Sequence, residues 1–269
     1  MAFEWYPRAS VPMNSNWTLT KDPLGNTTHQ FVVDYTDHRK VTGSLWIPEK
    51  EVRPGVVVTF MHGASGNRLQ APIPYLSNLF TNRGITSLAI DGPVHGLRKK
   101  LDGGRIALYA EMSKPKSLNY LFKDWELALE LVERKLQFSI ETIAYFGLSM
   151  GTFFGIPYLA NRHLSGKSTT VAVLGLMAPT GVVSPFRKRL LRDASNVHCP
   201  LNFLIQQEDE MFSPAACFEL FGSLASPSKQ LRENPGKHAA VPLSEFDYSF
   251  EFICNQLLEW CAASRTSVD

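Results

Sequence analysis

The stretch IAYFGLSMG, Ile143 to Gly151, decides which fold this chain is expected to adopt. Its first four residues are apolar, as in a buried β-strand, and a serine then stands between two glycines. The segment that follows, Thr152 to Leu164, has the pattern of a helix. A strand, a tight turn and a helix in this order form a G-x-S-x-G elbow, which exposes the serine hydroxyl as a nucleophile. The alternative is an ordinary strand-to-helix turn in which Ser149 is the helix N-cap.

Apolar runs like this one recur along the chain and predict a sheet. Parallel strands covered on both faces are expected at Gly55–Gly63, Ile85–Gly92, Thr142–Gly147, Thr169–Pro179 and Cys199–Asp209. An antiparallel hairpin is expected before them, from His29–Tyr35 and Val41–Pro48. Apolar periodicity predicts helices at Leu118–Leu136 and Glu245–Ala262. This alternation predicts an α/β fold with a mostly parallel central sheet, an N-terminal antiparallel hairpin and helices on both faces.

A serine nucleophile needs a base, and the predicted topology selects one histidine for that role. The carboxyl ends of parallel strands meet at one edge of a sheet, where active sites lie. Of the seven histidines, four are expected away from this edge: His29, His38, His163 and His198. His238 follows the last predicted strand in a loop before the final helix, so we predict that it is the base. The alternative is a solvent-exposed loop histidine.

A carboxylate that orients the histidine is expected at a strand end between Ser149 and His238. The sequence offers three consecutive acids there: Glu208, Asp209 and Glu210. We choose Asp209, because an apolar pair and then Ser213-Pro214 follow it, which indicates a loop that enters a helix. The two glutamates remain alternatives, and acids clustered in a loop are more often merely solvated.

Three further segments follow predicted strands: HGASG (62–66), DGPVHG (91–96) and DEMFSP (209–214). Together with GLSMG, they resemble the α/β-hydrolase family, in particular serine esterases related to dienelactone hydrolase. In that family the nucleophile, the acid and the histidine occur in the chain order of Ser149, Asp209 and His238. The resemblance covers Gly55 to Ala262 and implies a single α/β-hydrolase domain over residues 1–269.

The resemblance also implies an oxyanion hole. The segment FMHGASG is similar to the family's His-Gly loop, so the donors would be the backbone N–H groups of Ala64 and Met150. It implies that His62 orients this loop by hydrogen bonds and that His95 is structural or lines the pocket. The family more usually has glycine where this chain has Val94.

The substrate is expected to contact residues around these positions. Candidates for substrate binding are His62, His95, Phe153, Met211 and Phe212. For Phe153, and for Phe154 beside it, the alternative is packing of the helix on the sheet.

Short insertions that resemble a lid are expected near 92–117 and 180–198, the second with one basic helix. Their basic residues are Arg98, Lys99, Lys100, Arg105, Lys114, Lys116, Arg187, Lys188, Arg189 and Arg192. These side chains would attract a carboxylate-bearing substrate. The simpler interpretation is a solvated face of surface loops.

Serine at the elbow implies acyl transfer to water, where haloalkane dehalogenases of this fold use aspartate and dienelactone hydrolases use cysteine. The leading prediction is therefore a carboxylic-ester hydrolase that acts through an acyl-enzyme. The alternatives are cleavage of a C–C bond, a thioester or an amide by the same residues, and a non-catalytic ligand-binding protein. No metal or organic cofactor is expected, since the sequence has no G-x-G-x-x-G or P-loop pattern.

Composition is consistent with small-molecule chemistry. With 269 residues, 44% of them hydrophobic, the chain is long enough for one large domain. A net charge of only +2 gives no argument for nucleic acid or membrane partners. The N-terminal segment has no signal-peptide pattern, and the four cysteines have no C-x-x-C spacing, so we expect a cytoplasmic protein with reduced thiols. The sequence leaves homo-oligomer formation open.

Overall fold

The computed structural model describes residues 17–34, 40–99, 105–114 and 117–266. Within these residues a nine-stranded sheet has the order β1-β2-β3-β5-β4-β6-β7-β8-β9. The strands are β1 (Trp17–Lys21), β2 (Thr27–Asp34), β3 (Lys40–Trp46), β4 (Val56–Met61), β5 (Thr86–Ile90), β6 (Thr142–Gly147), β7 (Ser168–Gly175), β8 (Leu201–Gln206) and β9 (Lys229–Asn234). The antiparallel hairpin of β2 and β3 is confirmed, and β3 pairs antiparallel with β5. From β5 to β9 each neighbouring pair is parallel, which confirms the predicted fold class.

The two edge strands of this sheet were not predicted. β1 pairs antiparallel with β2, and β9 pairs parallel with β8. The described residues therefore contain six parallel strands, and the prediction of five was wrong. The reason is that β9, with the sequence KQLREN, has only one neighbour and is half exposed along most of its length. An edge strand of this kind lacks the continuous apolar run that marks a buried strand.

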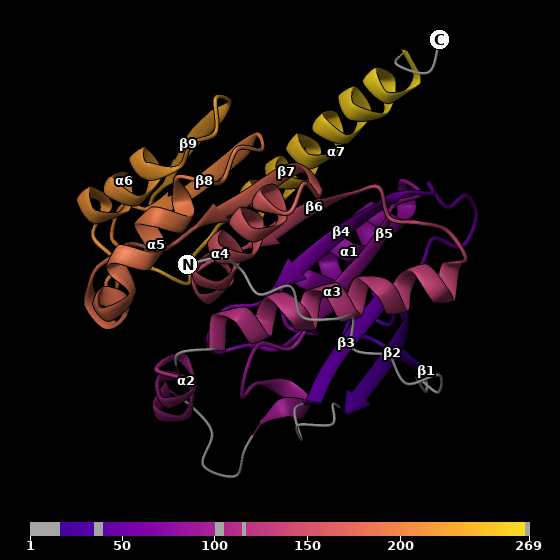
Figure 1. Ribbon diagram of the computed structural model, residues 1–269, viewed down its shortest axis with the longest axis horizontal. Helices are drawn as coiled ribbons and strands as arrows, with labels where there is room; N and C mark the ends of the chain where they lie inside the picture. The colour runs from indigo at the N-terminus through magenta and orange to yellow at the C-terminus, as the bar shows by residue number, and fades with distance from the viewer. Residues whose placement is uncertain (1–16, 35–39, 100–104, 115–116, 267–269) are drawn as a thin grey trace.

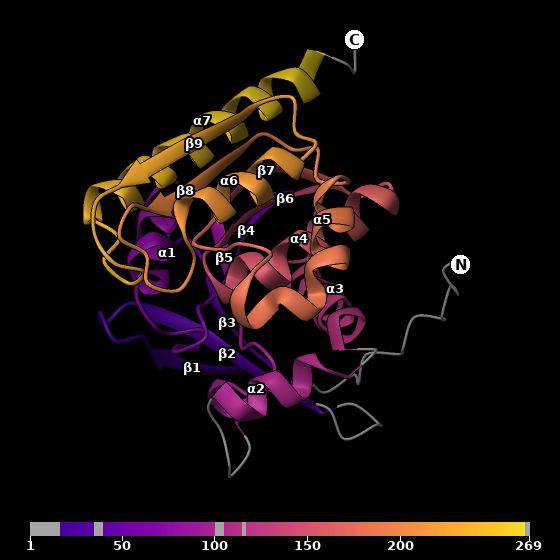
Figure 2. The same ribbon diagram turned by 90° about the vertical axis from the view of Figure 1, so that its left-hand side faces the viewer.

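Helices cover both faces of the sheet (Figures 1 and 2). They are α1 (Ile73–Asn82), α2 (Arg105–Met112), α3 (Ser117–Leu136), α4 (Met150–Leu164), α5 (Arg187–Ala194), α6 (Pro214–Ser223) and α7 (Leu243–Thr266), with short 3₁₀ helices η1 (Gly96–Arg98) and η2 (Gly181–Phe186). α1 and α7 bury one apolar cluster against the sheet, and the remaining long helices α3 and α4 bury another on the opposite face. Burial on both faces explains why β4, β5, β6 and β8 are buried at every position.

The two predicted insertions both follow the carboxyl ends of parallel strands. The first, 92–117, follows β5 and contains η1 and α2; residues 100–104 and 115–116 lie outside the described part of the chain. The second, 180–198, follows β7 and contains η2 and the expected basic helix α5. In Figure 2, α2 and α5 lie on the side of the sheet that α3 and α4 cover.

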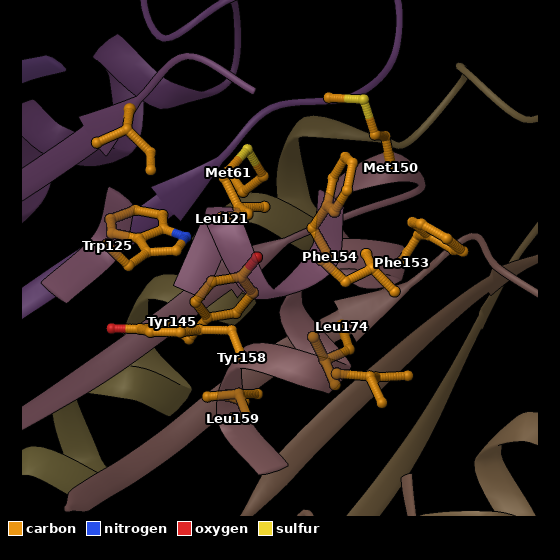
Figure 3. Packing of buried hydrophobic residues seen from close by; sticks show 14 of the residues in the cluster. Met61, Leu121, Trp125, Tyr145, Met150, Phe153, Phe154, Tyr158, Leu159 and Leu174 are labelled. Carbon is orange, nitrogen blue, oxygen red and sulfur yellow. The ribbon is translucent and has the colours of Figure 1, made fainter. Parts of the chain in front are cut away.

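Three aromatic side chains support the segment that carries the elbow serine. Tyr145 of β6, Tyr158 of α4 and Trp125 of α3 are fully buried and contact one another (Figure 3). The Tyr145 hydroxyl donates to the carbonyl of Gly151 at 2.7 Å, in the first turn of α4. Because Tyr145 is fixed at both its ring and its hydroxyl, it determines how closely α4 approaches β6.

Gly155 of α4 allows this close approach, and substitution by alanine tests it. A Cβ at Gly155 would lie 2.5 Å from Tyr145 Cε1. Alanine stabilises an open helix position by about 1 kcal/mol relative to glycine, but overpacking a core costs about 1–3 kcal/mol. We expect Gly155→Ala to lower the free energy of unfolding by up to about 2 kcal/mol in urea denaturation.

The control is Gly222→Ala in α6, where an added Cβ meets no atom within 4 Å. That variant should be as stable as the parent protein or gain up to about 1 kcal/mol. Equal effects of the two substitutions would contradict the role given to Tyr145.

Candidate active site

The predicted elbow is present between β6 and α4. Ser149 has φ +57° and ψ −116°, a backbone conformation that residues other than glycine rarely adopt. Its side chain makes no N-cap hydrogen bond, so the ordinary N-cap alternative is wrong. Its N–H donates to the carbonyl of Gly175 at 2.9 Å, at the end of the neighbouring strand β7. The hydrogen bond to β7 therefore helps to stabilise this strained conformation, and the Ser149 hydroxyl is not used as a helix cap.

Close contacts with three strands hold the elbow in place and require glycine at position 151. A Cβ at Gly151 would lie 2.5 Å from the carbonyl oxygen of Met61, the last residue of β4. Thr152 links the two other strand ends, because its hydroxyl lies 2.8 Å from the carbonyl oxygen of Gly147 and 2.7 Å from that of Gly175. The N–H of Gly175 donates back to the same hydroxyl. The elbow is thus tied to β4, β6 and β7 together.

The structure brings the three predicted catalytic side chains into one hydrogen-bonded chain. His238 Nε2 lies 2.9 Å from Ser149 Oγ, and His238 Nδ1 lies 2.7 Å from Asp209 Oδ2. An ionised carboxylate only accepts hydrogen bonds, so the proton is on Nδ1 and Nε2 accepts from the serine hydroxyl. This is the tautomer that a general base requires.

Asp209 is itself held in place by the loop that follows β8. Its Oδ1 accepts from the N–H groups of Met211 at 2.8 Å and Phe212 at 2.9 Å, and the side chain is only 1% exposed. The ring nitrogens of His238 bond to Asp209 and Ser149, whereas the carboxylates of Glu208 and Glu210 accept from the backbone N–H groups of Gly236 and His238. The two glutamates are exposed but are not merely solvated.

His62 fixes the loop that follows β4 and is neutral. It is 4% exposed; its Nε2 accepts from the N–H of Gly92 at 2.8 Å, so Nδ1 carries the proton and donates to the Gly63 carbonyl at 2.7 Å. Burial, the largest cause, lowers the pKa of His62 to about 4. Both ring nitrogens are thus engaged within the protein, which favours the orienting role over direct substrate contact.

His95 connects the loops after β4 and β5. Its ring nitrogens lie 2.7 Å from the Pro93 carbonyl oxygen and 2.8 Å from that of Ala64. Val94 beside it has φ +59°, so this loop adopts the glycine-like conformation although the chain has valine there. His95 therefore determines where Ala64 lies, and its role as a substrate contact stays a prediction.

The two predicted oxyanion donors belong to adjacent segments of the same sheet edge. Met150 is the first residue of α4, directly after Ser149, and Ala64 lies in the loop after β4. β4 and β6 are neighbours in register, with Met61 opposite Gly147. A Cβ at Gly92 would lie 2.9 Å from the Met150 side chain, so the loop after β5 closes over the same point.

The predicted apolar contacts fall into two groups. Phe153 and Phe154 are each 2% exposed and contact one another (Figure 3). Phe153 also contacts Phe186 of η2. Phe212 is buried with its ring 5.8 Å from that of His238, whereas Met211 is 41% exposed. Of the predicted apolar contacts, Met211 is therefore the one most open to a ligand.

Arginines of the two insertions are engaged within the protein. Arg187 pairs with Glu219, Arg192 pairs with Asp193 at 2.9 Å, and Arg98 pairs with Asp124 at 2.8 Å. Lys100, Lys116 and the side chain of Arg105 lie outside the described residues. These ion pairs remove much of the charge that would attract a carboxylate, so they favour the simpler interpretation of a surface face.

Sequence reasoning missed a buried ion pair that fixes the loops beside the elbow. Asp91 is fully buried, and its Oδ2 lies 2.6 Å from Arg68 Nη1 and accepts from the N–H of Leu97 at 3.1 Å. It also accepts from the Thr42 hydroxyl of β3 at 2.5 Å. The Asp91 of DGPVHG was visible in the sequence, but no pattern identifies Arg68 as its partner.

The buried Cys217 thiol and two further histidines, His163 and His198, do not compete with Ser149 and His238 for the catalytic roles. Burial raises the pKa of the Cys217 thiol near Asp209 to about 12, so it stays protonated at neutral pH. His163 and His198 stack on each other with ring centroids 4.2 Å apart, at the amino end of the strands as expected. In the described parts of the chain, no group of three His, Cys, Asp or Glu side chains is placed to hold a metal ion. None of the described helices is long and apolar enough to span a membrane.

No model of a protein family matches the chain, and no curated protein matches it by sequence. Among solved structures, a cold-adapted esterase from an Arctic intertidal metagenomic library is 31% identical and covers 91% of this chain and 99% of its own, with a TM-score of 0.76. Acetyl xylan esterase from Paenibacillus sp. R4 is 20% identical over 90% of this chain and 88% of its own, with a TM-score of 0.64. Dienelactone hydrolase from Anabaena variabilis ATCC 29413 is 16% identical over 86% of this chain and 98% of its own, with a TM-score of 0.60. The last two show a common fold.

The lowered pKa of His62 predicts acid-sensitive stability. From pH 6.5, the ordinary pKa, down to about pH 4, the unfolded chain binds a proton at this ring that the folded protein does not. The free energy of unfolding therefore rises with pH across this window, by up to about 3 kcal/mol from His62 alone. Glutamine does not titrate in this range. In His62→Gln, the free energy of unfolding measured by urea denaturation should therefore differ less between about pH 4.5 and about pH 7 than in the parent protein. An unchanged difference in the variant would contradict the assignment.

Proposed function

The chain belongs to the α/β-hydrolase family, and we propose that it is a serine esterase that hydrolyses a carboxylic ester through an acyl-enzyme. The observation that carries the proposal is the hydrogen-bonded chain from Asp209 through His238 to Ser149, at the strained elbow after β6. The 31% identical structure is that of an esterase, which supports ester cleavage over the other reactions open to these residues.

In the first step, Ser149 Oγ attacks the ester carbonyl carbon while His238 Nε2 takes the hydroxyl proton. The 2.9 Å distance between these atoms is suited to this transfer. The imidazole then carries a positive charge, which the buried carboxylate of Asp209 stabilises at 2.7 Å. Asp209 also prevents the ring from turning, since it holds Nδ1.

The negative charge that develops on the carbonyl oxygen is stabilised by the backbone N–H groups of Ala64 and Met150. Met150 begins the 15-residue helix α4, so the positive end of the helix dipole faces the same position. Removal of one such donor typically costs about 3–4 kcal/mol of transition-state stabilisation. His62 and His95 act here by holding the Ala64 loop.

Collapse of the tetrahedral intermediate breaks the ester C–O bond, and His238 Nε2 gives its proton to the leaving alkoxide. Water then attacks the acyl-enzyme with His238 again as the base, which releases the carboxylic acid and restores Ser149. These steps use only side chains and backbone groups of the chain, the ester and one water molecule.

An uncharged acyl group is the substrate class that the surroundings favour. The exposed Met211 side chain and the buried Phe212 follow in the same loop as Asp209 and offer apolar contacts. The Arg187 guanidinium, which would bind a carboxylate, is paired with Glu219 instead.

The test is ester turnover together with labelling of the nucleophile. The protein should hydrolyse p-nitrophenyl acetate and be labelled by a fluorophosphonate probe on the peptide that contains Ser149. Ser149→Ala should lose labelling and at least about 10³-fold of the turnover, because the remaining groups cannot form an acyl-enzyme.

Two results would argue against the proposal. Full turnover by Ser149→Ala would place the chemistry elsewhere. Labelling of Ser149 without turnover of any p-nitrophenyl ester would favour cleavage of a thioester, an amide or a C–C bond by the same residues.

A further inference from the structure

The loop that carries His238 has no regular structure of its own. It runs from the end of β9 to the start of α7, residues 235–242, and nothing in it is helix or strand. A single side-chain contact with Asp209 does not fix a ring in such a loop, because the backbone could shift beneath it. Other contacts must therefore set the position of the ring relative to Ser149.

Gln206, the last residue of β8, makes the most extensive contact with this loop. Its side chain is 1% exposed, and Nε2 lies 3.2 Å from the carbonyl oxygen of Pro235, 3.3 Å from that of Lys237 and 3.0 Å from that of Ala240. These three carbonyls lie on both sides of His238 in the sequence. One buried amide thus holds the loop before and after the histidine.

The arrangement of the amide indicates that this contact is specific. Within the described residues, Gln206 Oε1 is buried and has no hydrogen-bond partner. A buried amide is unfavourable unless its groups are paired, and leucine in its place would continue the apolar run of β8. Gln206 therefore bonds only through its Nε2 amino group, and all three carbonyl acceptors of that group belong to the His238 loop.

The two glutamates beside Asp209 hold the N–H groups of the same loop. Glu208 accepts from the N–H of Gly236, and Glu210 accepts from the N–H of His238 at 3.0 Å. The hydrogen bond from His238, the largest cause, lowers the pKa of the Glu210 carboxyl, so it stays ionised at neutral pH. Together, Gln206, Glu208 and Glu210 form a loop clamp, a group of side chains that bonds to the backbone of the His238 loop.

We propose that the loop clamp positions His238 for the reaction, with Gln206 as its main positioning residue. The proposal rests on the proposed function, since it assigns the clamp to the same histidine. Residues 206, 208 and 210 hold the loop backbone, while Asp209 between them holds the ring. Gln206 dominates because its contact is buried, whereas the two carboxylates are exposed to competing water.

The first experiment compares two buried amides of β8. Gln206→Met keeps the length of the side chain and removes the donors. Asn202→Leu is the matched control, because Asn202 is also fully buried in β8 and its amide has no partner among the described residues. Both variants are first shown to be folded by circular dichroism and thermal unfolding.

With p-nitrophenyl acetate, Gln206→Met should lower kcat by about 10- to 100-fold and change KM by less than about threefold. Fluorophosphonate labelling of Ser149 should slow by a similar factor. Asn202→Leu should keep kcat within about twofold of the parent protein. A Gln206→Met enzyme that is folded and has the kcat of the control overturns the proposal.

The second experiment tests Glu210 and remains decisive if Gln206→Met does not fold. Glu210→Ala removes the acceptor for the His238 N–H and should lower kcat about three- to tenfold. Glu210→Gln retains an acceptor oxygen and should restore kcat to within about twofold of the parent protein. Equal kcat values for the two Glu210 variants overturn the role of the clamp.

Ser149→Ala separates this inference from the function itself. If that variant loses activity while the clamp variants keep theirs, only the clamp is refuted. If Ser149→Ala retains full activity, the proposed function fails first and the clamp fails with it.

Discussion

The hydrogen bond between Asp209 Oδ2 and His238 Nδ1 is the contact on which the rest of the site depends. It joins two loops that leave adjacent parallel strands, β8 and β9, and it sets the tautomer that leaves Nε2 facing Ser149. The bond forms in a nearly water-free position, since the Asp209 side chain is 1% exposed and the His238 side chain 12%. The interaction between the two groups is stronger there than at the surface.

A second constraint places Ser149 beside Nε2, the other ring nitrogen of His238. Ser149 is held in a sparsely populated backbone conformation, which costs about 1–3 kcal/mol. The ties of Tyr145 to Gly151 and of Thr152 to Gly147 and Gly175 over-determine the turn, so the core sustains its strain. The helix that begins at Met150 then directs its amino end at the same position. Packing, strain and electrostatics therefore act at one edge of the sheet.

The sequence was sufficient for the central parallel strands and for the three residues of the hydrogen-bonded chain. Buried strands are long apolar runs, and chain order with sheet topology left few partners for Ser149. β9 was missed, because a polar edge strand such as KQLREN resembles a loop in composition. The contacts of Gln206 with the His238 loop and of Arg68 with Asp91 were also missed. Such pairs are distant in sequence and become neighbours only when the loops have formed, so no local pattern reveals them.

Substitution of each consecutive acid after β8 tests the central assignment most directly. In Asp209→Asn the amide can donate to Nδ1 and favour the wrong imidazole tautomer, so kcat for p-nitrophenyl acetate should fall by about 10³- to 10⁴-fold. Glu208→Gln and Glu210→Gln keep an acceptor for the loop backbone, so each should keep kcat within about twofold of the parent protein. A loss of about 10³-fold in kcat for either glutamate variant, with Asp209→Asn still active, would contradict the account.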